Sequence, residues 1–252
     1  MNYRTLAMFF RPLAFVAAAT VLALSAGVAQ AQTYPGPNST GYVASPIAFN
    51  WRDMTGANLV VGGDDGFASI TLPFAFTLAG TAYNNLWMST NGIVGFDLSN
   101  QDVHCCQGNH AIAATVAPAH MDWVSDVTAK TTGTPGSQSL VIEWNGHDYD
   151  EDTSLLAMQL VLHEGTNDIE FQYSTLTNTY NSAYIGLGGS DALGYYANTY
   201  DALNNYLGPV TMVHQGILIS VPAVPEPESY ALMLAGMGIV GAAVRRRRAS
   251  IV

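Results

Sequence analysis

Leu156-Ala-Met-Gln-Leu-Val-Leu-His163 and Ile169-Glu-Phe-Gln-Tyr-Ser174 are two runs in which large apolar residues alternate with other residues. An alternation with a period of two is typical of a β-strand, because successive side chains of a strand point to opposite faces. The five residues between the runs, 164–168, read Glu-Gly-Thr-Asn-Asp and have the composition of a turn. The two runs are therefore predicted to pair as an antiparallel hairpin, which is the clearest hairpin signal in the chain.

Shorter segments of the same kind occur on both sides of this hairpin. Residues 67–78 alternate in part, with an interruption at Pro73, and the strand at 140–144 is predicted to end at Asn145-Gly146. Asn91-Gly92 is predicted to supply the positive φ angles of a tight hairpin turn. Further strand candidates are residues 86–88, 93–96, 184–187, 194–197, 210–213 and 217–221.

The body of the chain has no stretch with a convincing helical period, so strands are expected throughout. Its roughly 190 residues are enough to bury one sizeable core. The predicted fold is all-β, an antiparallel and jelly-roll-like β-sandwich over residues 32–221, with an N-terminal signal helix and a short C-terminal membrane helix.

The first 31 residues have the order of a secretory signal peptide. Arg4 and Arg11 make the beginning basic, residues 13–28 are apolar, and Ala29-Gln30-Ala31 has the small-x-small form that signal peptidase cleaves. Signal peptidase is therefore an expected partner, and the mature chain is predicted to begin at Gln32. A retained N-terminal helix is the alternative.

The last residues, 222–252, contain three parts in a defined order. Pro225, Glu226 and Pro227 lie in a proline-rich stretch that disfavours both helix and sheet. Residues 230–244 are predicted as a short membrane helix, whose part from Ala231 onward spans roughly 21 Å against the roughly 30 Å of a bilayer core. The third part is a basic cluster that the positive-inside rule places in the cytoplasm, Arg245, Arg246, Arg247 and Arg248.

This order resembles the PEP-CTERM sorting signal of Gram-negative bacteria, with Pro225-Glu226-Pro227 as the motif. In that family the signal is read by exosortase, a membrane transpeptidase, commonly alongside export of extracellular polysaccharide. The resemblance implies a precursor that crosses the inner membrane, is held there transiently by its C-terminal helix, and ends at the cell surface or outside the cell. An ordinary short C-terminal anchor is the alternative.

The charge of the predicted mature body is strongly negative. Between Gln32 and Ala223 the chain has two cations, Arg52 and Lys130, and seventeen carboxylates, which gives a formal charge of −15. Such a surface repels nucleic acid and anionic lipid, so no nucleic-acid partner is expected. The charge suits a soluble extracellular protein or one that binds cations.

A second set of short motifs lies within residues 62–187. It consists of Gly63-Asp64-Asp65-Gly66, Leu72-Pro73-Phe74, Gly80, Tyr83, Ser89-Thr90-Asn91-Gly92, Ala117-Pro118, Asp122, Val141-Ile142-Glu143-Trp144 and Asp168-Ile169-Glu170-Phe171. Together these motifs resemble an extracellular β-sandwich module of bacterial secreted proteins that is similar to nidogen-type domains. The resemblance implies an accessory or adhesive module without catalytic residues. Ala119-His120 departs from the pattern, because bulkier apolar or aromatic residues are expected before Asp122.

The two cysteines of the chain are adjacent, Cys105 and Cys106, and are flanked by His104 and His110. In an oxidising exterior a disulfide is the favoured state, either between these neighbours or between two molecules. A zinc or copper site with the histidines is an alternative, but the usual two-residue spacer between the cysteines is missing. Unpaired thiols are the third possibility.

Asp148, Asp150 and Asp152 place carboxylates at alternate positions of one loop, where oxygen donors could wrap a calcium ion. The loop lacks the central glycine of a helix-loop-helix calcium site, and a simply solvated loop is the favoured interpretation. Asp64-Asp65 allows the same two interpretations. No cofactor other than this calcium ion is predicted.

The sequence has no recognised catalytic motif, and the chain is predicted not to be an enzyme. Carboxylate pairs such as Glu143 with Asp122 could hydrolyse a glycosidic bond, which requires the two groups to stand roughly 5 to 10 Å apart. The expected role is a structural, adhesive or carbohydrate-binding module in extracellular polysaccharide or biofilm. A secreted glycoside hydrolase and a calcium-binding surface protein are the alternatives. Tyrosines that could stack on sugar rings are Tyr195, Tyr196, Tyr200 and Tyr206.

Overall fold

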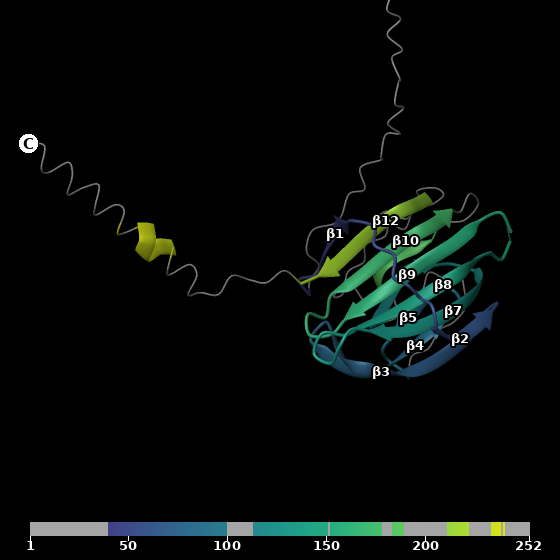
Figure 1. Cartoon of the computed structure of the whole chain (residues 1–252), viewed down its shortest axis with the longest axis horizontal. Coiled ribbons are helices and arrows are strands. Elements are labelled where there is room, and N and C mark those ends of the chain that lie inside the picture. The colour runs from purple at the N-terminus through teal and green to yellow at the C-terminus, as the bar shows by residue number, and fades with distance from the viewer. Residues whose placement is uncertain are drawn as a thin grey trace, which may run out of the picture. The chain divides into compact units, whose positions relative to one another are not determined.

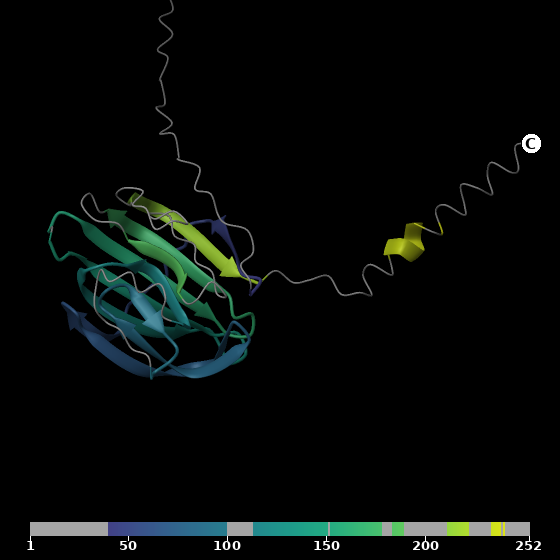
Figure 2. The same cartoon turned by 180° about the vertical axis from the view of Figure 1, so that it is seen from behind.

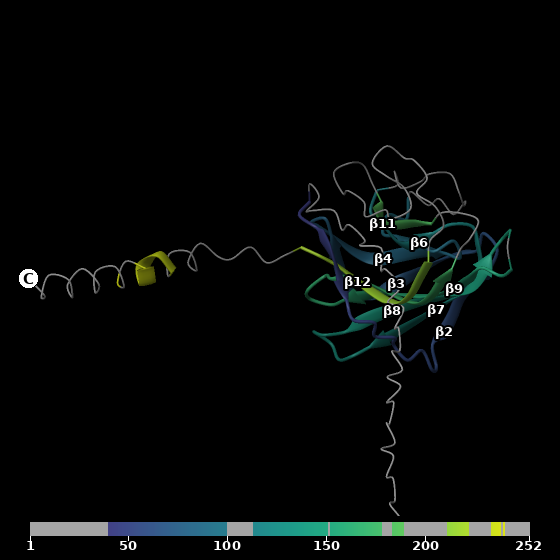
Figure 3. The same ribbon diagram turned by 90° about the horizontal axis from the view of Figure 1, so that it is seen from above.

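The computed structural model describes residues 40–99, 113–150, 152–177, 183–188, 211–221, 233–237 and 239 (Figure 1). The body is an antiparallel sandwich of two sheets, as predicted, and Figure 3 shows the two layers seen from above. One sheet has seven strands in the order β1 (Val43–Ile47), β12 (Thr211–Ser220), β10 (Ile169–Thr177), β9 (Leu155–His163), β8 (Ser139–Asp148), β7 (Trp123–Thr132) and β2 (Asn58–Gly63). The other, in front in Figure 2, has five in the order β11 (Tyr184–Gly188), β6 (Thr115–His120), β5 (Ile93–Gly95), β4 (Thr81–Ser89) and β3 (Phe67–Leu78).

The connectivity of the sandwich is simpler than the predicted jelly roll. β3 to β6 follow one another as neighbours in the five-stranded sheet, and β7 to β10 do so in the seven-stranded sheet. Each sheet is therefore built around a meander, whereas a jelly roll is made of Greek keys. β1 and β2 lie at opposite edges of the seven-stranded sheet, so the connection between them has to cross that sheet.

The core lies between the sheets and follows the alternation of the predicted hairpin. Met158 and Leu160 of β9 and Phe171 and Tyr173 of β10 are fully buried in one cluster that contains side chains of both sheets. The hydroxyl group of Tyr173 donates a hydrogen bond of 2.6 Å to the carbonyl of Pro118 in the opposite sheet. The core therefore combines apolar packing with a polar contact between the layers.

Two glycine signals have a different structural meaning from the one predicted. β8 does not end at Asn145-Gly146 but continues to Asp148, because Gly146 lets β7 approach closely. A β-carbon at Gly146 would overlap the carbonyl oxygen of Val124 and lie 2.7 Å from Cα of Ser125. In the turn after β4, Gly92 has a positive φ of 73°, whereas Asn91 does not adopt one.

Other differences concern strand ends. β3 is continuous through Pro73, although its pairing with β4 shifts register between Thr71 and Phe76. The two candidates at 210–213 and 217–221 are one strand, β12, which contains His214 at a positive φ of 50°. The alternation did not predict β1, β2, β6 or β7.

Residues 48–57 connect β1 to β2, and we call this segment the strap. In Figure 1 the strap is the dark trace that crosses in front of the seven-stranded sheet from β1 to β2. It lies on the outer face of that sheet, away from the core. The site described below lies under this segment.

The tail is described only at residues 233–237 and 239, which are helical, as expected for this part of 230–244. Within the described part of the chain, no helix has both the length and the apolar character required to cross a membrane. The signal peptide at 1–31, the motif Pro225-Glu226-Pro227, the basic cluster at 245–248 and the strand candidate at 194–197 lie outside the described residues.

Candidate functional site

A row of buried polar side chains lies on the outer face of the seven-stranded sheet, beneath the strap. Glu143, Gln159 and Gln172 come from the adjacent strands β8, β9 and β10, and the register sets each opposite the next. All three are 9% exposed or less. A buried polar group without a hydrogen-bond partner destabilises the fold, so these three side chains are expected to be hydrogen-bonded to one another or to the segment that covers them.

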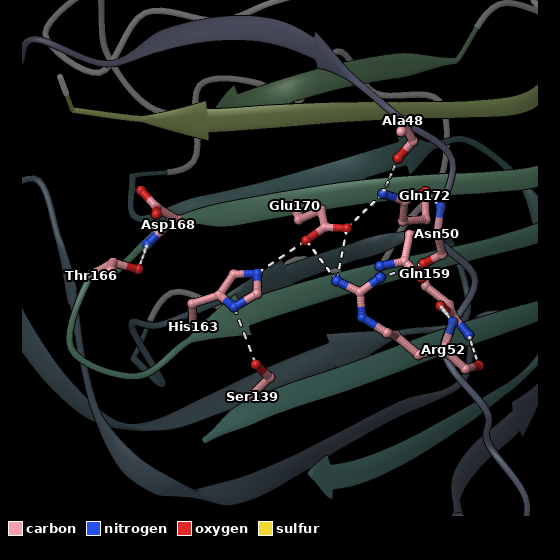
Figure 4. Close-up of polar contacts among 10 residues, drawn as sticks. All are labelled: Ala48, Asn50, Arg52, Ser139, Gln159, His163, Thr166, Asp168, Glu170 and Gln172. Carbon is pink, nitrogen blue, oxygen red and sulfur yellow. Dashed lines mark hydrogen bonds and ion pairs between the residues drawn. The ribbon is translucent and has the colours of Figure 1, made fainter. Parts of the chain in front are cut away.

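The two glutamine amides hold the strap by its backbone (Figure 4). Gln159 accepts a hydrogen bond of 2.9 Å from the N–H of Arg52 and donates one of 2.9 Å to the carbonyl of the same residue. Gln172 accepts from the N–H of Asn50 at 2.8 Å and donates to the carbonyl of Ala48 at 3.5 Å. Each side-chain amide thus pairs with the strap as a neighbouring peptide group would.

The side chain of Arg52 closes the layer through an ion pair with Glu170. Its Nη2 atom lies 3.0 and 2.9 Å from the two carboxylate oxygens. His163 bridges Glu170 and Ser139, with 3.1 Å at each ring nitrogen, and Gln172 donates to Glu170 at 2.5 Å. Burial raises the pKa of Glu170, but the hydrogen bond with His163, the charge of Arg52 and the bond from Gln172 together hold that pKa below its ordinary value. The carboxylate is therefore ionised at neutral pH.

The second cation of the mature body also binds the strap. Nζ of Lys130, on β7, donates hydrogen bonds of 2.8 Å to the carbonyl of Asp53 and 2.9 Å to that of Thr55. Arg52 and Lys130 are the two cations between residues 32 and 223, so both are used to fasten this one segment. The sequence showed their scarcity but gave no signal for this shared role.

A second constellation brings together the motifs that carried the nidogen-type resemblance. Ligand oxygens of Asp64, Asp65 and Asp122 all lie within 4.8 Å of one another. Asp64 and Asp65 are exposed, and Asp122 is half-buried at the start of β7. Asn91 joins the two parts, because its amide donates to Asp65 at 2.8 Å and accepts from the N–H of Trp123 at 2.9 Å.

The turn at residues 89–92 is buried and forms the base of this constellation. The N–H of Thr90 donates a hydrogen bond of 2.9 Å to the carbonyl of Gly66, and the N–H of Gly66 donates one of 2.8 Å to Oγ1 of Thr90. The carbonyl of Thr90 accepts from Ser125 at 2.7 Å, and that of Ser89 accepts from the Trp144 indole at 2.8 Å. These contacts fix the turn that carries Asp64 and Asp65 against both sheets.

The three carboxylates are compatible with a divalent cation. Calcium binds oxygen ligands at about 2.3–2.6 Å, so two ligands on opposite sides of one ion stand about 4.6–5.2 Å apart. The 4.8 Å limit for Asp64, Asp65 and Asp122 falls within that span. Without a cation, three like charges at this distance repel one another.

The predicted calcium loop has a different arrangement. Asp148 is buried and accepts a hydrogen bond of 2.8 Å from the N–H of Asp150, whereas the Asp152 side chain is 92% exposed. Among the described residues, Asp64, Asp65 and Asp122 are the one group of three whose ligand atoms lie close enough together to hold a metal ion. Calcium at Asp148, Asp150 and Asp152 stays a prediction.

The carboxylate pair considered for hydrolysis is not brought together. Glu143 pairs with Thr128 of β7, which is six residues beyond Asp122. At about 3.3 Å per residue, the two acids are roughly 20 Å apart along the strand, well beyond the range for glycoside hydrolysis. Both oxygens of Glu143 also accept hydrogen bonds, from Asn145 at 2.5 Å and from Gln159 at 2.6 Å.

An open cleft of about 470 Å³ lies next to Val221, directly after the end of β12. Asn167 is part of its wall and accepts a hydrogen bond of 2.7 Å from the N–H of Thr77. The hydroxyl group of Tyr42 accepts from the N–H of Ala79 at 3.2 Å. The cleft is lined by Thr40, Tyr42, Thr77, Ala79, Gly80, Thr166, Asn167 and Val221.

Several predicted site residues lie outside the described part of the chain. They include the possible disulfide at Cys105 and Cys106 and the neighbouring His104 and His110. The proposed sugar-stacking residues Tyr195, Tyr196, Tyr200 and Tyr206 are also outside it. His120, which departs from the expected pattern, is described and lies buried at the end of β6, paired with Tyr184.

Comparison with known families assigns both parts of the chain. A family described as NIDO related matches residues 41–220, which is most of the sequence and the whole sandwich. The chain belongs to the NIDO-related family. The PEP-CTERM protein-sorting motif matches residues 223–248, directly after the NIDO-related domain. No curated protein and no solved structure matches the chain significantly.

The two matches agree with the resemblances stated from the sequence. The sorting motif marks the chain as an exported protein of a Gram-negative bacterium, processed by exosortase. The NIDO-related domain is the part that such processing delivers.

Proposed function

We propose that the NIDO-related domain is a structural or adhesive module of the extracellular matrix, with extracellular polysaccharide as its ligand. The observation that carries this proposal is the junction between the two matched parts. β12 ends at Ser220 and the sorting motif begins at residue 223, so the sandwich is joined to its delivery signal with almost no linker. Val43 at the start of β1 is paired with Ser220, so both ends of the sandwich lie at one corner.

The cleft next to Val221 supports a polar ligand of this kind. Its threonine hydroxyl groups and the Asn167 amide are the donor and acceptor types that bind sugar hydroxyl groups. The polar row beneath the strap supports a non-catalytic role, because its carboxylates are engaged in internal contacts. The proposal therefore keeps the earlier expectation that the protein is not an enzyme.

Binding and hydrolysis are separated by one experiment on polysaccharide from the producing organism. The mature protein is expected to sediment with the polysaccharide without releasing reducing sugar. Release of reducing sugar that is lost in Glu143→Gln would refute the non-catalytic role and support a glycoside hydrolase. Thr166→Val, which removes one hydroxyl group from the cleft, is expected to weaken sedimentation; Thr71→Val, on the exposed side of β3, is the matched control.

The sorting step is tested with the tail alone. Residues 222–252 fused to a secreted reporter are expected to be cut near the motif in a strain with exosortase and to remain uncut without the enzyme. Replacing Pro225, Glu226 and Pro227 by alanine is expected to leave the reporter in the inner membrane. An unchanged tail mass in both strains would support an ordinary membrane anchor instead.

A further inference from the structure

β1 and the first part of the strap, residues 48–52, form one arm that comes before every other strand of the sandwich. We define this arm as residues 42–52. It is joined covalently to the body only through the hinge at residues 53–57, which leads to β2. Because the arm is the first element of the sandwich, it can leave the sheet and return without threading through another loop. β1 pairs with β12 alone, since it is an edge strand.

The contacts that hold the arm on the body can be made equally well by the arm of a second copy of the chain. The β1–β12 ladder and the amides of Gln159 and Gln172 contact the arm through its backbone. Of the arm, only Tyr42 and Ala44 are buried in the core, and residues 45–52 are half-buried or exposed. The arm is therefore held by backbone pairing, by the burial of Tyr42 and Ala44, by the ring contact of Phe49 with His214, and by one charged contact, Arg52 with Glu170.

Charge limits which segment can take the place of the chain's own arm on the outer face of the seven-stranded sheet. The body carries −15, so an occupant has to bring a cation to the buried Glu170 carboxylate. The arm of a second copy does this in register, because Gln172 binds Ala48 and Asn50 and Gln159 binds the backbone of Arg52 itself, which carries the cation. We propose that two copies of the NIDO-related domain exchange their arms, each placing β1 and residues 48–52 on the sheet of the other.

The hinge explains how the closed and exchanged forms differ. Residues 54–57 form a tight turn, in which the N–H of Ala57 donates 2.9 Å to the carbonyl of Met54 and Gly56 has a φ of 78°. Lys130 holds this turn by its bonds to Asp53 and Thr55. In the exchanged pair the turn opens, while all other contacts of the arm are made again with the second body. Lys130 is therefore the latch that favours the closed monomer.

The exchange is tested by a disulfide that can form only between copies. Ser45 and Leu218 stand opposite each other in the β1–β12 ladder, at a spacing suited to a disulfide. One preparation of the exported chain carries Ser45→Cys and the other, distinguished by mass, carries Leu218→Cys. After mixing under mild oxidant, a disulfide-linked heterodimer is expected. While dimer is scarce, its fraction rises about tenfold for each tenfold rise in protein concentration, as mass action requires.

Three controls make the result decisive. The double variant Ser45→Cys/Leu218→Cys in one chain is expected to link internally, which shows that both cysteines are correctly placed. Thr71→Cys, on the exposed side of β3, replaces Ser45→Cys to measure random linkage, including linkage through Cys105 and Cys106. Lys130→Met removes the latch and is expected to raise the heterodimer fraction roughly tenfold.

A heterodimer fraction equal to that of the Thr71→Cys mixture at every concentration, both with and without Lys130→Met, would overturn the proposal. Added salt is expected to raise the heterodimer fraction, because it screens repulsion between two bodies of −15. Arm exchange does not require a polysaccharide ligand, so it can fail while the proposed matrix role holds, and the reverse is also true.

Discussion

Replacing Arg52 by methionine tests whether one ion pair fastens the strap. Methionine keeps much of the aliphatic stem but removes the guanidinium group from Glu170. The carboxylate side chain is 8% exposed, and after the substitution it retains only its hydrogen bonds with His163 and Gln172. Removing one partner of a buried ion pair typically costs about 3–5 kcal/mol.

The expected loss lies at or just below the lower limit of that range, for two structural reasons. The Arg52 side chain is 24% exposed, so its charge is partly solvated in the folded protein. His163 also remains beside Glu170, 3.1 Å from its oxygen. We therefore expect Arg52→Met to lower the free energy of unfolding by about 2–3 kcal/mol, which for a domain of this size corresponds to a fall in Tm of about 4–12 °C.

Urea unfolding followed by tryptophan fluorescence measures this loss, because Trp87, Trp123 and Trp144 are fully buried. Arg52→Lys is the matched control: it keeps the charge but loses the planar guanidinium group, whose Nη2 contacts Glu170 while Nη1 donates to the carbonyl of Asn50, and it is expected to lose less stability than Arg52→Met. A double-mutant cycle with Glu170→Gln isolates the pair. A coupling energy below about 0.5 kcal/mol would refute the idea that the Arg52–Glu170 ion pair fastens the strap, since that value is typical of an exposed pair.

Three further predictions follow from particular contacts. The pKa of Glu170 lies below its ordinary value of 4.5, so the ionised carboxylate stabilises the fold fully above pH 4.5. This stabilisation is lost as the pH falls from 4.5 through the folded-state pKa. Below pH 4.5, the Tm of Glu170→Gln is therefore expected to depend less on pH than the Tm of the wild type. Gly146→Ala is expected to destabilise the sandwich by about 2–4 kcal/mol in urea unfolding, because the new β-carbon would overlap the carbonyl of Val124; a wild-type value would contradict the close approach of β7 and β8. Asp64→Asn is expected to raise Tm in chelator by relieving repulsion from Asp65 and Asp122, and to reduce any rise in Tm that millimolar calcium gives the wild type; a wild-type Tm that calcium does not change would exclude a structural ion at this cluster.

The sequence predicted the hairpin of β9 and β10 because large apolar residues recur at every second position of both strands. β9 and β10 bury Met158, Leu160 and Phe171 on the side facing the core, so their alternation was informative. All six residues of β6 are buried, which leaves no contrast between its faces, and the alternation missed it. β1 contains Pro46, and β2 ends in two glycines at an exposed edge, so neither has an ordinary strand composition.

The candidate sites depend on contacts between distant residues, and these could not be predicted from local patterns. Gln159, Glu170 and Gln172 are polar residues of amphipathic strands, and nothing nearby in the sequence shows that their face is covered. Arg52, which covers it, is 107 residues before Gln159 and 118 before Glu170. In the second constellation the family resemblance selected the right motifs, but only the fold shows that Asn91 holds them together.

The use of both cations inside the protein restricts the matrix partners that the NIDO-related domain can bind. Arg52 is paired with Glu170 and Lys130 with strap carbonyls, so neither is available to an anionic ligand without opening the strap. A body of −15 then repels an acidic polysaccharide, and the repulsion is weakened only by salt or by divalent cations bound between the two. A neutral polysaccharide meets no such barrier. Binding to acidic polysaccharide should therefore require millimolar calcium or high salt, whereas binding to neutral polysaccharide should proceed in chelator. Tight binding of an acidic polysaccharide at low salt in chelator would contradict this argument. It would show that cations from another part of the molecule, or those under an opened strap, face the ligand.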